Sequence, residues 1–590
     1  MVNLKAKPYY LSDEDIKWVE DTIKGMTDEE KVGQLFFQLT MGLDEQYLKN
    51  LVEKYHVGGI RYNNVPGHMI ALHNATLQKY SKLPLVIACN TETGGNGSCA
   101  NGTFIASGIK IGATGKDEYA YQLGKCSNEE AAAIGCNMAF APVCDIHYNW
   151  ENTEVVTRAF GNDPARVASM SKAYLDGAHT IDGFACAAKH FPGNGIDFRD
   201  AHLSNNINDF TEEKWMETYG HVYKTLIDAD LDAIMGGHIM MPEYMRAVKP
   251  GITDEEMLPA TLCPEIMTGL LREKLGFNGM VVTDASHMIA MTNRMTRREM
   301  LPTSINAGCD MFLFFNDPDE DFATMLDAYR SGVISEERMT EALMRILGLK
   351  AHMGLNKKSR EELSTPASDL AERLGKPEYK AVSDAISRDA LTLVKYKDEG
   401  VLPISPEKNK RVMIVHIKGP ASPFEALAKM AMGMGGGKNP AEDLRDRLIE
   451  KGFDAFIYES PMDQMQKQIA RGEKPNINVY FAGKNAIDDF TSDKDLVITL
   501  CDVSNGRPSF GFSKGGGEIP WYVFELPVIG ISVNAPTMLA DMPQLRTYIN
   551  AYDSKPSTME ALVDALLEGP DAFKGSDPID SFCGLWDARI

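Results

Sequence analysis

The first 350 residues of the chain alternate short apolar runs with longer helical stretches, and this alternation narrowly limits the possible folds. Runs that are apolar on both faces and end in polar or glycine-rich segments are typical of strands in a parallel sheet. Eight such runs are found, the first of which also fits a helix: 31–38, 57–62, 84–90, 136–143, 184–190, 231–239, 280–285 and 309–315. Amphipathic helices, clearest at 262–277 and 336–354, separate them. We therefore predict an α/β fold with an N-terminal (β/α)8 TIM-type barrel over residues 1–355.

A second alternation of the same kind follows the barrel. Residues 356–405 are rich in charge, and we interpret them as a linker and a docking helix. Strands are expected at 411–419, 453–460, 495–503, 527–535 and 547–552, with helices at 441–451 and 558–569. This pattern predicts a C-terminal αβα sandwich domain over residues 406–590.

Composition excludes several classes of function. The chain carries 60 Lys and Arg against 83 Asp and Glu, a net charge of -23, which repels phosphate backbones and anionic lipid headgroups. We therefore expect no nucleic-acid or membrane partner. No run of 18 apolar residues occurs, and the first residues have no apolar stretch typical of a secretory signal, so we expect a cytoplasmic protein. The ten cysteines form no C-x-x-C pair, which favours buried thiols over a zinc site or disulfides.

Polar side chains follow five of the predicted barrel strands. In such barrels the catalytic groups lie where the strands end, at the carboxyl side. We therefore expect a shared site at one rim, formed by Asn90, Asp145, His190, His238 and Asp284.

Two segments at this rim carry candidate chemistry. In KHFPGNGIDFRDAHLSNN (189–206), Asp200 and His202 are two residues apart, so a loop could bring the carboxylate against the imidazole for acid–base work. On spacing alone, a capping aspartate beside a solvated histidine is the simpler alternative. Asp284 ends the predicted strand 280–285 and could be a nucleophile, an electrostatic stabiliser or a metal ligand. The alternative is an N-cap for the following helix.

Two glycine-rich segments of the second domain are weaker candidates. GMGGGKN (433–439) lacks the residues of a Walker phosphate loop and is interpreted as a connection. KGGGEIPW (514–521) could offer Glu518 to a site, but an ordinary connection is the simpler interpretation.

Several motifs in order resemble glycoside hydrolase family 3, and within it the β-N-acetylglucosaminidase branch. They are EEKVGQLF, GGIR, an acidic residue before Gly-Gly, FAPVCDI, TRAFGNDP, KHFPGNGIDFRDAH, PATLCPEI and LGFNGMVVTDASHM. The resemblance covers about residues 27–350 and continues more loosely beyond. Two departures alter the loop that carries Asp200 and His202: Asn194 and Ala201 stand where the family commonly has His and Ser.

The resemblance implies a role for each matching residue. Asp284 matches the nucleophile, His202 the general acid/base and Asp200 its dyad partner. Lys189, His190, Arg158 and Asp145 match positions that contact the sugar, and His238 is added as a rim residue. Where the family has Asp before Gly-Gly, this chain offers Asn90 and Glu92.

The resemblance thus implies a retaining exo-β-N-acetylglucosaminidase that acts on small oligosaccharides or glycosides without metal or organic cofactor. Asp284 would form a glycosyl ester, and a neutral imidazole in the second step would admit phosphate as well as water, since it does not repel an anion. The alternatives are a β-glucosidase-like enzyme with Glu518 as the acid, a β-N-acetylglucosaminide phosphorylase, and a non-catalytic carbohydrate sensor. The second domain is expected to be a scaffold or to mediate a homodimer.

Overall fold

The computed structural model describes residues 2–419, 438–474, 487–504 and 518–590. Contacts between residues divide the chain into two units, which are considered separately. The first comprises Met1–Gly108 and Lys116–Val382, and the second comprises Ile109–Gly115 and Ser383–Ile590.

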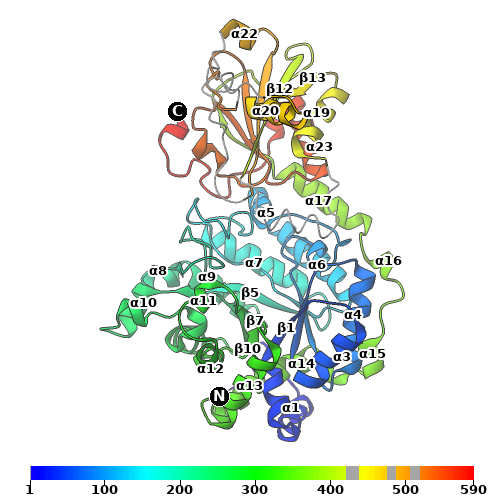
Figure 1. Ribbon diagram of the computed structural model, residues 1–590, viewed down its shortest axis with the longest axis vertical. Coiled ribbons are helices and arrows are strands. Elements are labelled where there is room, and N and C mark those ends of the chain that lie inside the picture. Colours follow the sequence, from blue (N-terminus) through cyan, green and yellow to red (C-terminus); the bar gives the residue numbers. More distant parts are fainter. Residues whose placement is uncertain (1, 420–437, 475–486, 505–517) are drawn as a thin grey trace. The chain divides into compact units, whose positions relative to one another are not determined.

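The first unit is a closed barrel of parallel strands, with helices around it (Figure 1). Among the described residues, eight strands close the barrel in this order: β1 (Phe36–Thr40), β10 (Met311–Leu313), β9 (Met280–Ala285), β7 (Ala233–Gly236), β5 (Ala185–Phe191), β4 (Met138–Ala139), β3 (Val86–Cys89) and β2 (Gly59–Tyr62). Each predicted run overlaps one of these strands, so the TIM-type barrel is confirmed. Only the first run is divided, since α2 (Asp28–Gln34) occupies its beginning and β1 starts at Phe36.

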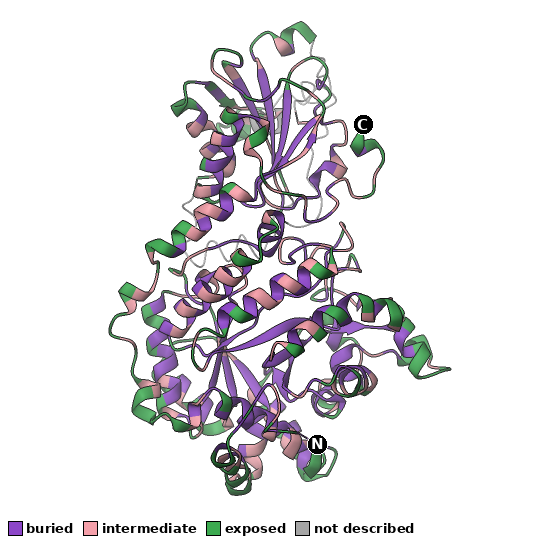
Figure 2. Cartoon of the chain, turned by 180° about the vertical axis from the view of Figure 1, so that it is seen from behind, coloured by how far each residue is buried: buried purple, intermediate pink, exposed green. Residues whose placement is uncertain are grey.

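The barrel strands are buried along most of their length, and the surrounding helices expose their outer faces (Figure 2). Side-chain caps start several of these helices: Thr27 and Glu30 form a capping box on α2, as Thr296 and Glu299 do on α12. The main helices are α1 (Asp13–Gly25), α3 (Glu45–Tyr55), α4 (Gly67–Tyr80), α6 (Asp117–Ala133), α7 (Pro164–Ala178), α9 (Tyr219–Asp228), a helix over Glu265–Lys274, α12 (Arg297–Ala307), α13 (Pro318–Arg330) and α14 (Glu336–His352). The helix predicted at 336–354 is α14, and the helix predicted at 262–277 is the one over Glu265–Lys274.

The second unit is an α/β domain with one mixed sheet. In the described part of the chain its order is β11 (Thr392–Tyr396), β16 (Thr547–Asn550), β15 (Val528–Ser532), β14 (Leu496–Asp502), β12 (Arg411–Lys418) and β13 (Asp454–Ile457). All neighbours are parallel except β11 and β16. Helices α19 (Pro440–Glu450) and α23 (Pro556–Glu568) share one hydrophobic core with the strands. All five predicted strands and both predicted helices are present.

The predicted linker over 356–405 requires correction. Helices α15 (Arg360–Ser364) and α16 (Leu370–Arg373) belong to the first unit, and Arg360 donates a hydrogen bond to the Lys79 carbonyl on α4 at 2.7 Å. From Ser383 the chain belongs to the second unit, where β11 forms the edge of the sheet. The charged composition concealed this strand because an edge strand needs only one partner and one buried face.

A short piece of chain between β3 and α6 also belongs to the second unit. This piece forms α5 (Gly108–Thr114). Two residues of the helix, Ile109 and Ala113, are buried in a cluster with Ala390, Tyr552 and Ile579. Lys110 on the same helix is fully buried. Its ammonium group lies 2.8 Å from the Asp553 carboxylate and donates to the hydroxyls of Ser387 (2.9 Å) and Thr558 (2.6 Å).

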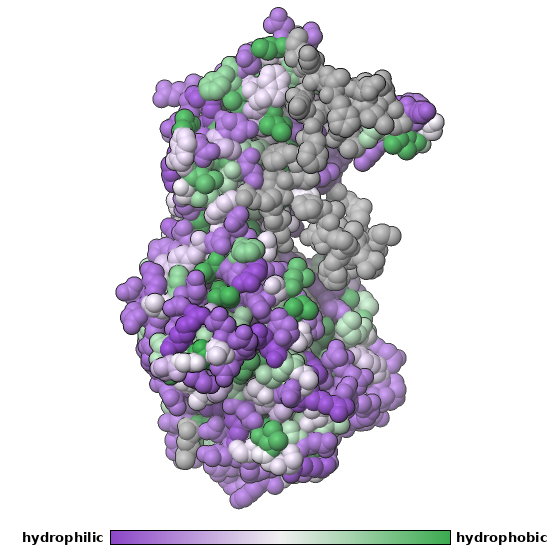
Figure 3. Space-filling view, turned by 60° about the vertical axis from the view of Figure 1, so that its left-hand side comes forward, coloured by the Kyte–Doolittle hydropathy of each residue, from purple (hydrophilic) through white to green (hydrophobic). Residues whose placement is uncertain are grey.

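The two glycine-rich candidates of the second domain lie mostly outside the described residues: 433–437 and 514–517 are among those not described. Nine of the ten cysteines are buried, as expected for structural thiols. Within the described ranges, no helix has the length and apolar character needed to cross a membrane. The face drawn in Figure 3 is mainly hydrophilic with scattered hydrophobic residues, in keeping with the acidic composition.

We predict that Lys110→Met destabilises the second unit by about 3 kcal/mol, because it leaves the Asp553 carboxylate buried without its cation. Urea unfolding measures this loss. The double variant Lys110→Met/Asp553→Leu should recover much of it, since no unpaired charge remains. Lys397→Ala, at an exposed position in the same unit, is the control. Equal stability of the Lys110 variant and the control would contradict the prediction.

Candidate active site

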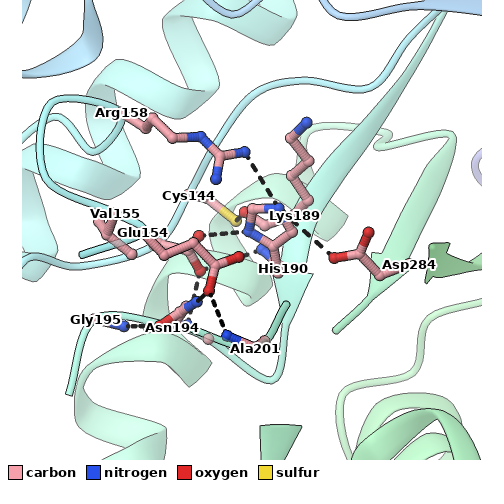
Figure 4. Close-up of polar contacts among 12 residues, drawn as sticks. Cys144, Glu154, Val155, Arg158, Lys189, His190, Asn194, Gly195, Ala201 and Asp284 are labelled. Atoms are coloured by element: carbon pink, nitrogen blue, oxygen red, sulfur yellow. Dashed lines mark hydrogen bonds and ion pairs between the residues drawn. The ribbon is translucent and has the colours of Figure 1, made fainter. Parts of the chain in front are cut away.

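Asp284 lies at the carboxyl end of β9, at the rim of the barrel (Figure 4). Its Oδ1 accepts a hydrogen bond from the Ala285 backbone N–H at 2.7 Å, and its Oδ2 lies 4.0 Å from Nε2 of His190. The side chain caps no helix, because the next helix, α11 (Ile289–Thr292), has Met288 as its N-cap. The N-cap alternative for Asp284 is therefore excluded, and the carboxylate faces the site.

His190 is held in place by a buried carboxylate. Its Nδ1 lies 2.7 Å from Oδ2 of Asp145, and its backbone N–H donates to the other oxygen at 3.2 Å. Asp145 is fully buried, and burial raises the pKa of its carboxyl, but His190 and the N–H groups of His190 and Asn194 lower it to a net value below the ordinary one. The ring is thereby fixed with Nε2 toward Asp284 and within 3.4 Å of the Arg158 guanidinium (Figure 4).

Glu92 collects two cations beside this histidine. Arg158 donates to both of its oxygens, from Nε at 2.9 Å and from the terminal nitrogen at 3.0 Å, and the Lys189 ammonium lies 2.5 Å away. Burial raises the pKa of Glu92, but the charges of Arg158 and Lys189 outweigh it and hold that pKa well below its usual range. Two cations against one carboxylate leave this wall of the site positive.

The positive wall acts on the nucleophile candidate. Burial alone would raise the pKa of Asp284, but His190, His238, the Ala285 N–H and Lys189 together lower it below the ordinary value. Asp284 is therefore an anion at neutral pH, aimed at the barrel mouth, and an ionised carboxylate is what nucleophilic attack requires.

Asp200 and His202 form the predicted pair in the loop after β5, here called the dyad loop (residues 192–205). Nδ1 of His202 lies 2.7 Å from Oδ1 of Asp200, which also accepts the His202 backbone N–H at 2.8 Å. The hydrogen bond to Asp200 raises the pKa of His202 above its ordinary value against the opposing effect of burial. The histidine side chain is 52% exposed, so its other nitrogen remains available to a ligand.

Backbone hydrogen bonds join the dyad loop to the segment that follows Asp284. The Ile289 N–H donates to the His202 carbonyl at 3.4 Å, and the Ala290 N–H donates to the Ala201 carbonyl at 3.1 Å. Ala201 is buried in a small cluster with Met288 and Ala290. The acid–base pair and the nucleophile candidate thus lie on two segments that contact one another.

The glycines of the dyad loop serve close packing. Gly193 and Gly195 have φ angles of 120° and 112°, which side chains rarely adopt. A Cβ on Gly193 would lie 2.1 Å from the Tyr219 ring, and one on Gly195 would lie 1.9 Å from the Ile146 carbonyl oxygen. The root of the loop is therefore buried and closely packed.

Two predicted sugar contacts, His238 and Asn90, stand apart from the charged cluster. Both ring nitrogens of His238 bind protein atoms, Nδ1 at 2.7 Å from the Thr261 hydroxyl and Nε2 at 3.1 Å from the Ala285 carbonyl. His238 thus supports the end of β9 and has no nitrogen left for a sugar. Asn90 follows β3, but among the described residues its side chain makes no hydrogen bond to the cluster, and Glu92 takes that place.

Glu154 is a member of the site that sequence reasoning missed. It lies in the loop between β4 and α7, where no motif marks it, although Asp145 and Arg158 on either side do. Its Oε2 accepts from the Asn194 side chain at 2.8 Å and from the Ala201 N–H at 3.3 Å (Figure 4). Its Oε1 lies 3.9 Å from Nδ1 of His202.

Glu154, Asp200 and His202 together form a candidate ligand set for a cation. One donor atom from each of Glu154, Asp200 and His202 lies within 4.8 Å of the others. However, Nδ1 of His202 donates a proton to Asp200, and the same nitrogen cannot also coordinate a metal. The cluster is therefore better suited to proton transfer than to binding a cation.

Comparison with known proteins decides the family. A family model described as the glycosyl hydrolase family 3 N terminal domain matches residues 27–349. The chain belongs to glycoside hydrolase family 3. It is therefore an enzyme of the hydrolase type, as the motifs predict.

Similar proteins cover the full length of this family 3 enzyme. A β-N-acetylglucosaminidase/β-glucosidase of Cellulomonas fimi is 36% identical over 100% of both chains. The solved β-glucoside phosphorylase BglX is 34% identical, with a TM-score of 0.87 over 99% of both chains. A β-N-acetylglucosaminidase from Paenibacillus sp. FPU-7 has the same fold, with a TM-score of 0.75 and 24% identity, over 94% of this chain and 99% of that one.

We predict that Glu92→Gln lowers stability by about 3 kcal/mol at neutral pH, because it leaves the buried charges of Lys189 and Arg158 unpaired. The folded-state pKa of Glu92 is lowered, so its contribution is complete above the unfolded-state pKa of about 4.3 and is lost as pH falls further. Urea unfolding at several pH values should show a constant difference from the wild type between pH 5 and 8, shrinking below about pH 4. Glu14→Gln, at an exposed position, should change little. A difference that grows on acidification would refute the assignment.

Proposed function

We propose that this family 3 enzyme is a retaining exo-β-glycosidase that releases terminal β-linked N-acetylglucosamine, with Asp284 as nucleophile and the Asp200–His202 pair as acid/base. The observation that carries the proposal is the pairing of an ionised carboxylate on a positive wall with a carboxylate-bound imidazole on an adjoining loop. Retaining glycosidases need one group to attack the anomeric carbon and a second to protonate the leaving oxygen. The resemblance of the motifs to the β-N-acetylglucosaminidase branch supports these two roles.

In the first step, Asp284 attacks the anomeric carbon while the bond from that carbon to the leaving oxygen breaks. The electron pair of that bond stays with the oxygen, which takes a proton from Nε2 of His202. Asp200 faces Nδ1 and stabilises the imidazolium that supplies this proton. In the second step, neutral His202 takes a proton from water, the water oxygen bonds to the anomeric carbon, and the ester bond to Asp284 breaks.

The positive wall supports binding of the sugar and stabilisation of Asp284 in this scheme. Lys189 and Arg158 carry several N–H donors each, and Glu92 and Asp145 orient the wall through Arg158 and His190. Such fixed donors suit a glycone with several hydroxyl groups. The name of the Cellulomonas fimi relative includes both β-N-acetylglucosaminides and β-glucosides, so we extend the proposed substrates to β-glucosides as a second glycone.

We predict that His202→Ala lowers kcat/KM by about 10²- to 10⁴-fold for glycosides with poor leaving groups and much less for 4-nitrophenyl glycosides, which need little acid assistance. Because the first step requires protonated His202, whose pKa is raised, the kcat/KM of the wild type, which reports this step, should fall as pH rises above that elevated pKa. Azide should restore turnover of the activated substrate.

Asp284→Asn should abolish turnover of every substrate. The comparison variant for His202→Ala is Glu518→Ala in the second unit, the acid expected of a β-glucosidase-like enzyme. Loss of acid catalysis in the Glu518 variant, with His202→Ala unaffected, would overturn the proposal. A carbohydrate sensor would be indicated if the wild type bound sugar but turned over neither the β-N-acetylglucosaminide nor the β-glucoside.

A second candidate reaction is phosphorolysis of the same glycosyl ester. The likeness to the β-glucoside phosphorylase BglX over 99% of both chains supports it. So does the chemistry of the acid/base, because a neutral imidazole repels an incoming phosphate less than a carboxylate would. In this reaction a phosphate oxygen replaces water at the anomeric carbon, and the product is a sugar 1-phosphate.

Product analysis separates the two acceptors. We expect free sugar from 4-nitrophenyl β-N-acetylglucosaminide and β-glucoside in phosphate-free buffer, and mass spectrometry measures any sugar 1-phosphate that forms when phosphate is added. Free sugar as the main product in 10 mM phosphate would support hydrolysis. Phosphate-dependent turnover with sugar 1-phosphate as the main product would assign the enzyme as a phosphorylase.

A further inference from the structure

Glu154 occupies a position that neither the catalytic pair nor the sugar-binding wall explains. Its side chain is only 6% exposed. Across the described residues it makes no direct ion pair with Lys or Arg, although the charge of Arg158 acts on it. Its carboxylate lies 3.9 Å from His202. A buried carboxylate normally requires a cation or a full set of hydrogen-bond donors. Here two donors are present, the Asn194 amide and the Ala201 N–H, and the remaining oxygen faces the imidazole.

The loop that carries Glu154 is itself fixed to the dyad loop. The side-chain oxygen of Asn152 accepts the backbone N–H groups of Glu154 and Val155, at 2.9 and 2.6 Å. Its amide nitrogen donates to the Asp197 carbonyl at 2.6 Å. Asn152 is buried, so the Glu154 carboxylate is placed against the dyad loop by a rigid connection and not by a surface contact.

Asn194 joins Glu154 to the nucleophile side of the site. Its side-chain nitrogen donates to Glu154, and its backbone N–H donates to Oδ1 of Asp145 at 2.8 Å. Asp145 in turn orients His190, which lies 4.0 Å from Asp284. A continuous set of contacts therefore runs from Asp284 to His202 through Asn194 and Glu154, and it depends on the residue that departs from the family motif at position 194.

We propose that Glu154 is a positioning residue for the acid/base: its buried carboxylate holds Ala201 at the base of the dyad loop and faces Nδ1 of His202, so that the imidazolium meets the leaving oxygen. The inference rests on the proposed function. Two carboxylates thus face the same nitrogen of the imidazole, Nδ1, with Asp200 at 2.7 Å and Glu154 at 3.9 Å. An opposite charge at this distance favours the charged ring.

The charges around His202 come from four elements. Asp200 lies on its own loop, Glu154 on the loop after β4, Asp284 at the end of β9, and His238 on the loop after β7. The three carboxylates favour the imidazolium, whereas a charged His238 opposes it, and burial lowers the pKa of His238. The Arg158 guanidinium acts on both of these carboxylates, since its pKa is raised by Glu154 and it lowers the pKa of Asp200. Glu154 therefore adds its charge to that of Asp200, against the opposing charge of Arg158.

The test is the Glu154→Gln variant, since glutamine keeps an oxygen that can accept from Asn194 and Ala201 but has no charge. Titration of the His202 ring by NMR, with its signal identified by its loss in His202→Gln, should give a pKa about one unit below that of the wild type. Turnover of substrates with poor leaving groups should fall about tenfold at neutral pH, with a smaller change for 4-nitrophenyl glycosides. Glu154→Asp, which keeps the charge, should restore most of the pKa.

The matched control is Glu151→Gln, the same change at an exposed position of the same loop, and it should leave the His202 titration unchanged. An unaltered His202 pKa in folded Glu154→Gln would overturn the inference. Should that variant fail to fold, the double variant Asp200→Asn/Asp284→Asn decides, because Glu154 is then the remaining carboxylate among the three that raise the pKa of His202. A His202 pKa that stays above about 6.5 supports Glu154, and one at or below it refutes the role. Because the titration needs no substrate, it is decided separately from the proposed activity, which fails if the wild type turns over no glycoside.

Discussion

The active site depends on keeping the carboxylate of Asp284 ionised in a largely buried position. An isolated buried carboxylate would take up a proton, because transfer of its charge out of water costs several kcal/mol. The protein supplies compensation through a positive wall in which Lys189 and Arg158 share Glu92, while His190 is oriented by Asp145. Each of these side chains comes from the carboxyl end of a barrel strand or the loop that follows it. The closed parallel barrel is the feature that brings those ends to one rim.

The catalytic pair is organised differently, since it belongs to a loop. The two glycines of the dyad loop, Gly193 and Gly195, would by themselves allow it many conformations. Its root is instead packed at Gly193 and Gly195, and its far side is hydrogen-bonded to the segment after β9. Glu154 adds a third attachment from the loop after β4. The loop therefore presents His202 to the barrel mouth with its imidazole half exposed, a compromise between fixed orientation and access for the leaving group.

The family departures at Asn194 and Ala201 become intelligible together. The side-chain amide of Asn194 donates to Glu154, and its backbone N–H donates to Asp145, so the side chain ties the dyad loop to the loop after β4. The methyl group of Ala201 packs against Met288 and Ala290, where a hydroxyl would need a partner. Both positions are buried, and both residues contact Glu154, Asn194 through its side-chain amide and Ala201 through its backbone N–H.

The sequence by itself determined the barrel, the strands of the second domain except β11, and the residues at the strand ends, because apolar runs and their polar ends are local patterns. It also predicted the pair Asp200 and His202, whose contact spans only two residues. Only the tertiary structure decided that Glu92 and not Asn90 binds Lys189 and Arg158, that His238 supports β9, and that α5 belongs to the second unit. Glu154 could not be found from the sequence, because its partners at 194, 201 and 202 lie more than 35 residues away. The local sequence pattern determines which residues lie at the rim. Their charge partners, which set their protonation, come from distant loops and are determined by how those loops pack.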